Sequence, residues 1–135
     1  MGFFVKNKCG ECDVCCTYTE MLLSKSDIKL IFKKFRLKKL NLNDFTIKNE
    51  NGLYQLKNIN DACIFYNINS KNCSIYNFRP KGCRFYPLIY DIDKNNCVFD
   101  KDCPKPDIFY ENVTEIKKTC NKIKSFIRNE LELNI

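Results

Sequence analysis

The feature that most constrains this chain is its set of ten cysteines in 135 residues that contain no histidine. Four cysteines fall within eight residues, in the run Cys9-x-x-Cys12-x-x-Cys15-Cys16. The lack of histidine excludes every metal site and catalytic triad that needs an imidazole. The first residues hold too short an apolar run for a secretion signal, so we expect a cytoplasmic protein with reduced thiols. In that setting, such a dense run predicts metal binding rather than disulfides.

The spacing of the N-terminal run is typical of ferredoxin loops, in which three thiolates meet at one cluster and the fourth comes from elsewhere. Adjacent side chains in an extended segment point in opposite directions, so we expect Cys15 and Cys16 to serve two different centres. The later cysteines arrive singly, without a second C-x2-C pair. Zinc sites with four cysteine ligands usually use two such pairs, so thiols that arrive singly favour a [4Fe–4S] cluster. A zinc site is the alternative.

Two segments together resemble a known family. The run from Cys9 to Cys16 and the segment Cys73-Ser-Ile-Tyr-Asn-Phe-Arg79-Pro80-Lys-Gly-Cys83-Arg84 look like the C-x2-C-x2-C-C family of cysteine cluster proteins, also called YkgJ-type. The resemblance implies a zinc- or iron-chelating domain. The metal ligands that it implies are Cys9, Cys12, Cys15, Cys16, Cys63, Cys73, Cys83 and Cys103. Cys97 has no counterpart in the family pattern and is kept as an additional candidate ligand.

Three residues near these ligands need separate interpretations. Cys120 lies on the apolar stripe of the last predicted helix, so we expect a reduced, buried cysteine that is structural rather than a metal ligand. Arg79 and Arg84 flank Cys83. Their guanidinium groups are candidates for hydrogen bonds around a bound cofactor, to cluster sulfides or to the ligand loop, and an ordinary turn is the equal alternative.

The remaining patterns predict one small α+β domain over residues 1–135, with short strands and cysteine-rich loops between two helices. Apolar spacing predicts the first helix over 24–40, capped by Ser24 or Ser26, and the second over 111–132. A hairpin is predicted over 45–57, short strands and turns over 62–90, and a loop over 97–107.

These observations favour an iron–sulfur protein with one or two [4Fe–4S] clusters that transfers electrons or supports a redox or client protein. A zinc-bound interaction module is the alternative, and an enzyme is less favoured because no general base is evident beside the cysteines. No apolar run approaches the about 20 residues of a membrane helix, so no membrane partner is expected. Nucleic acid is disfavoured because only four arginines contribute to the net charge of +7.

Overall fold

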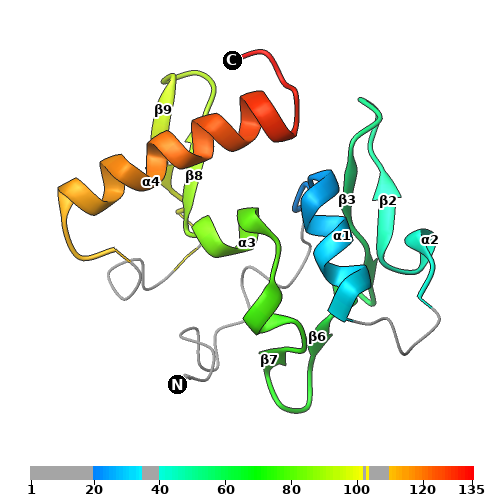
Figure 1. Ribbon diagram of the computed structural model, residues 1–135. Coiled ribbons are helices and arrows are strands. Elements are labelled where there is room, and N and C mark those ends of the chain that lie inside the picture. The colour runs from blue at the N-terminus through cyan, green and yellow to red at the C-terminus, as the bar shows by residue number, and fades with distance from the viewer. Residues whose placement is uncertain (1–19, 35–39, 102, 104–109) are drawn as a thin grey trace.

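The structure is a computed structural model that describes residues 20–34, 40–101, 103 and 110–135. Its two longer helices are α1 (Lys25–Lys34) and α4 (Val113–Ser125). The named strands form short antiparallel hairpins, and Leu22 adds a single antiparallel bridge to Gln55. Helix α1 lies beside the hairpin of residues 46–56, and α4 lies beside the hairpin of residues 88–99 (Figure 1). This arrangement confirms the predicted α+β class.

Helix α1 begins at a reciprocal cap. The Asp27 N–H donates to Ser24 Oγ at 3.1 Å, and the Ser24 N–H donates to Asp27 Oδ2 at 3.0 Å. Two of the N–H groups at the helix start are thereby satisfied, as the predicted Ser24 cap requires. On the inner face of the helix Ile31 is fully buried, whereas Phe35 of the predicted stripe lies outside the described residues.

The predicted hairpin over residues 45–57 is confirmed. The short helix α2 (Leu42–Phe45) leads into β2 (Thr46–Lys48), which pairs with β3 (Tyr54–Leu56). Gly52 closes the turn with a φ of 79°, a conformation that costs glycine little because it has no Cβ.

The middle of the chain consists of very short elements. They are β4 (Asn58–Ile59), β5 (Ala62–Cys63), β6 (Tyr66–Asn67), β7 (Asn72–Cys73), the 3-10 helix η2 (Tyr76–Phe78), α3 (Lys81–Phe85), β8 (Leu88–Asp91) and β9 (Asn96–Phe99). The predicted loop over 97–107 is wrong in its first part, because β9 pairs with β8 along its whole length.

The C-terminal helix confirms the element predicted over 111–132. Asn112 caps α4 by accepting the Glu115 N–H at 2.8 Å, and the π-helical turn η4 (Phe126–Glu130) extends the helix. Val113 is 66% exposed and so does not belong to the buried stripe. Every helix among the described residues is too short or too polar to cross a membrane.

Two apolar cores lie on either side of α3. We call them the N-terminal core (Leu23, Ile31, Phe45, Leu56, Cys63, Phe65, Ile75) and the C-terminal core (Leu88, Cys120, Ile123). Cys83 packs against the N-terminal core, and Phe85 of the same helix packs against the C-terminal core. Figure 1 shows α3 between α1 and α4.

Candidate metal centre

Three of the eight predicted ligands gather at the N-terminal core. Cys63 is part of this core with 7% of its surface exposed, and the half-buried Cys73 and Cys83 pack against it. The three residues come from three elements, β5, β7 and α3. Cysteines spaced ten residues apart in the sequence therefore reach one region of the fold.

A tight turn places Cys63. Asn60 and Asp61 both have positive φ angles, of 52° and 66°, and they form the two-residue connection between β4 and β5. Positive φ at both central residues is typical of a type I′ turn, whose twist suits a hairpin. Cys63 then ends β5.

The sulfur of Cys63 lies in surroundings that suit a metal thiolate. Burial raises the pKa of the Cys63 thiol, while hydrogen bonds from the backbone N–H groups of Phe65 and Tyr66 act in the opposite direction. A bound metal would replace the thiol proton, and both N–H groups would then stabilise the thiolate. The donor chemistry at this position therefore fits a zinc or iron ligand.

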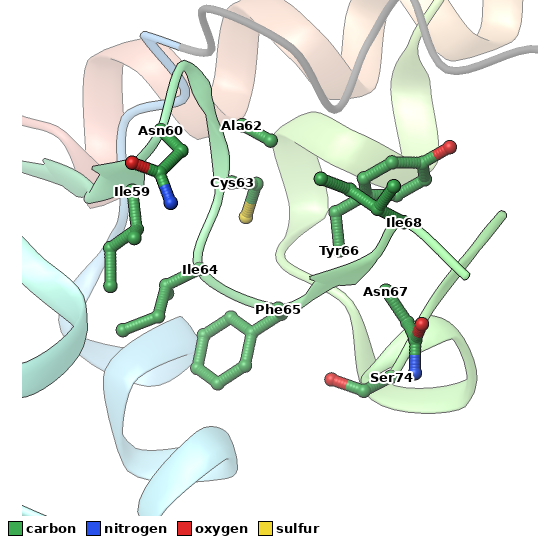
Figure 2. A pocket seen from close by; sticks show the side chains of 10 residues that line it. All are labelled: Ile59, Asn60, Ala62, Cys63, Ile64, Phe65, Tyr66, Asn67, Ile68 and Ser74. Atoms are coloured by element: carbon green, nitrogen blue, oxygen red, sulfur yellow. The ribbon is translucent and has the colours of Figure 1, made fainter. Parts of the chain in front are cut away.

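A surface hollow of about 420 Å³ surrounds Cys63. Figure 2 shows the Cys63 side chain between the segments that carry Ile59 and Tyr66. Ile59 and Ile68, which line the hollow, are 49% and 63% exposed. The hollow therefore gives solvent a path toward this buried region.

The hairpin that carries Cys73 has a counterpart further along the chain. Residues 66–73 read Tyr-Asn-Ile-Asn-Ser-Lys-Asn-Cys, and residues 90–97 read Tyr-Asp-Ile-Asp-Lys-Asn-Asn-Cys. In both, the tyrosine lies directly opposite the cysteine, as Tyr66 with Cys73 and Tyr90 with Cys97. Sequence reasoning missed this repeat, although the two segments share a tyrosine, an isoleucine, an asparagine and a cysteine at the same positions.

The two hairpins also share their turn chemistry. The side chains of Asn67 and Asp91 each accept N–H groups from the residues two and three positions later. The loops end at Lys71 and Asn95, whose φ angles are 54° and 51°. An Asx turn followed by one left-handed residue therefore positions Cys73 and Cys97 alike.

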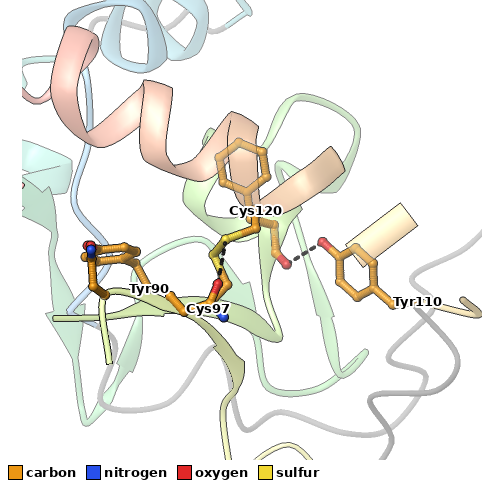
Figure 3. The surroundings of a disulfide bond; sticks show 7 residues. Tyr90, Cys97, Tyr110 and Cys120 are labelled. Carbon is orange, nitrogen blue, oxygen red and sulfur yellow. Dashed lines mark hydrogen bonds between the residues drawn. A yellow bond between two sulfur atoms is a disulfide. The ribbon is translucent and has the colours of Figure 1, made fainter. Parts of the chain in front are cut away.

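Cys97 and Cys120 form a disulfide, with their Cα atoms 5.7 Å apart (Figure 3). This corrects two expectations. Cys120 is buried on the helix stripe, but it is not a reduced thiol, and Cys97 is not available as an additional metal ligand while the bond exists. The pairing could not be read from the sequence, because it depends on β9 and α4 lying side by side.

Both arginines beside Cys83 hold the backbone of its loop. Arg79 Nη1 donates to the Tyr76 carbonyl at 2.9 Å, and its guanidinium lies 3.9 Å from the centre of the Tyr76 ring. Arg84 Nε donates to the Arg79 carbonyl at 2.9 Å. These contacts are those of a tethered turn, and a role of either arginine toward a cofactor stays a prediction.

A polar anchor that the sequence did not reveal fixes the first residue of α3. Asp27 is buried, and its Oδ1 accepts the Lys81 N–H at 3.1 Å. Lys81 Nζ donates to the two carboxylate oxygens of Glu130 at 2.7 and 2.6 Å. Partial desolvation would raise the pKa of Glu130, but hydrogen bonds from Lys81 and Ser26 outweigh it and hold this pKa below its usual value. We call Asp27, Lys81 and Glu130 the α3 anchor.

Close packing restricts the residue before Cys83. A Cβ atom on Gly82 would lie 2.2 Å from the Met21 Sδ, which is much closer than atoms can approach. Glycine at this position therefore lets α3 lie against the Met21 side chain, directly before Cys83.

The described residues hold part of a possible ligand set and do not complete it. No three Cys, Asp or Glu side chains within residues 20–34, 40–101, 103 and 110–135 lie close enough to hold one metal ion. Cys9, Cys12, Cys15 and Cys16 lie outside the described residues, and Cys103 follows β9 in a turn closed by its N–H on the Asp100 carbonyl. The ligand assignment stays a prediction.

Buried and half-buried thiols around one apolar core, with N–H donors at one of the sulfurs, are typical of a cysteine-rich domain of the metal–thiolate class. A family model supports this class directly. Residues 8–121 match the CxxCxxCC family, described as "Putative zinc- or iron-chelating domain". The chain belongs to this family, as its cysteine pattern predicted, and membership supports metal binding without separating zinc from iron. No curated protein and no solved structure matches the chain.

Proposed function

We propose that this domain binds one or two [4Fe–4S] clusters and serves in electron transfer or as a cluster-dependent accessory protein in the cytoplasm. The convergence of Cys63, Cys73 and Cys83 on one apolar core supports the proposal most directly. The N-terminal run, outside the described residues, would supply further thiolates in the family pattern. Bound iron–sulfur clusters would supply one-electron chemistry.

The surroundings of Cys63 suit such a cofactor. Solvent exposure and hydrogen bonds to sulfur are two of the factors that set the potential of a cluster. The N–H groups of Phe65 and Tyr66 would act on the sulfur, and the surface hollow beside Cys63 would let solvent approach it. The zinc-bound interaction module is the alternative, because the family description names zinc as well as iron.

Metal analysis after strictly anaerobic purification tests the proposal. We expect iron and acid-labile sulfide in equal amounts, about four or about eight of each per chain for one or two four-iron clusters. Cys63→Ser should lower both contents, whereas Ile75→Val, a conservative change at a buried position of the same core that carries no thiol, should leave them unchanged. Stoichiometric zinc without sulfide would establish the alternative, and metal content insensitive to Cys63→Ser would contradict the proposed site.

A further inference from the structure

The Cys97–Cys120 disulfide links β9 to α4 and lies outside the proposed ligand set. We propose that this disulfide is a redox-controlled lock on α3, the helix that carries Cys83, and that its reduction accelerates the loss of bound metal. The inference rests on the proposed metal-binding function. It adds a second site, which takes a dithiol reductant as its substrate.

One end of α3 rests on the surface that the disulfide fixes. Phe85 packs against the C-terminal core, of which Cys120 is a member, and its ring centre lies 5.9 Å from that of Phe126. The Tyr110 hydroxyl donates to the Phe85 carbonyl at 2.7 Å (Figure 3). Burial raises the pKa of Tyr110, so its hydroxyl keeps this proton. Cys83 lies only two residues before Phe85.

The other end of α3 is attached to the same C-terminal helix. Lys81 forms its ion pair with Glu130 in η4, which continues α4. Both ends of the five-residue helix therefore depend on the position of α4. The disulfide holds α4 against the β8–β9 hairpin, so breaking it would loosen Phe85 and Lys81 together, and Cys83 between them.

The two sulfurs differ in solvent exposure, and this difference decides which of them a reductant attacks. Cys97 is half-buried, whereas Cys120 is 6% exposed. A reductant thiolate would attack Cys97 Sγ, the Cys97–Cys120 bond would break, and Cys120 would leave and take up a proton. The second reductant thiol would then displace Cys97, so the reductant becomes a disulfide and the pair gains two electrons and two protons.

A hydrogen-bond acceptor lies near Cys120 and can stabilise its reduced thiol. Asn96 Oδ1 lies 3.7 Å from Cys120 Sγ, a distance at which a new S–H group can donate a weak hydrogen bond. Disulfides that form in reducing compartments are usually transient and redox-sensing. Because we propose a cytoplasmic protein, a reversible lock is the function that suits this bond.

Metal release from the anaerobically purified chain tests the lock. Iron and zinc release to a chelator should be at least about tenfold faster in Cys97→Ala/Cys120→Ala, which corresponds to about 1.4 kcal/mol. Phe85→Leu should also accelerate release while the disulfide remains. Tyr90→Leu is the matched control, because Tyr90 packs on the same core from β8 rather than from α3.

The outcomes separate the two proposals. A wild-type chain that holds no metal overturns the proposed function. A wild-type chain that holds metal, with equal release from the double variant, overturns the lock alone. If the double variant does not fold, wild-type release is compared with and without a dithiol reductant, with alkylation of Cys97 and Cys120 mapped by mass spectrometry. Release that stays constant while the pair changes from disulfide to thiols also overturns the lock.

Discussion

Removing the Cys97–Cys120 bond should cost the protein a calculable part of its stability. The two cysteines are 23 residues apart. In the chain-entropy description of a cross-link, closing a loop of this length stabilises the fold by about 3.4 kcal/mol, because the unfolded chain loses conformations. For 135 residues this corresponds to a fall in Tm of roughly 12 °C.

Urea unfolding of the metal-loaded protein without reductant measures this cost in Cys97→Ala, Cys120→Ala and the double variant. Each single change should lose the whole cross-link, and Cys120→Ala should lose on the order of 1 kcal/mol more because it also empties a buried site. The double variant should be little worse than Cys120→Ala, since one bond can be lost only once. Losses that simply add in the double variant would show that the two cysteines act independently and would refute the reasoning.

Three further predictions concern α3 and its anchor. Asp27→Asn should destabilise the fold by about 1–3 kcal/mol in urea unfolding. The two carboxylate oxygens accept the N–H groups of Ser24 and Lys81, whereas an amide has one acceptor oxygen and would turn its NH₂ group toward one of these donors. The pKa of Glu130 is lower in the folded than in the unfolded protein, so its ion pair with Lys81 stabilises the fold at pH values above the unfolded pKa. This stabilisation is lost as the pH falls through the folded pKa. Glu130→Gln should flatten this part of the pH–stability curve, and an unchanged curve would refute the assignment. Gly82→Ala should destabilise the wild type in thermal unfolding but much less in a Met21→Ala background, whereas equal losses in both backgrounds would exclude the packing explanation.

Local patterns allowed much of the fold to be predicted. Ser24 and Asp27 cap α1, the turn before Leu53 closes the first hairpin, and the stripe through Cys120 and Ile123 faces a core. Each of these features depends on residues that are neighbours in the sequence or lie one helical turn apart. The signal is therefore present in any short window of the chain.

Features that depend on distant segments could not be predicted. Asp27 is an ordinary first-turn carboxylate by sequence, yet it reaches the Lys81 N–H, 54 residues away. Cys97 is a candidate metal ligand by sequence, yet it forms a disulfide with Cys120 because β9 and α4 are neighbours in the fold. For the candidate centre, the sequence pattern selected Cys63, Cys73 and Cys83, and only the fold shows that they share one core.

The α3 anchor also has a consequence for how the protein is made. Asp27 and Lys81 are both synthesised well before Glu130, which follows Lys81 by 49 residues. At about 5–20 residues per second, the ribosome needs roughly 2–10 s to add that stretch. Of the two side-chain contacts that fix Lys81, the one to Asp27 can therefore form before the one to Glu130.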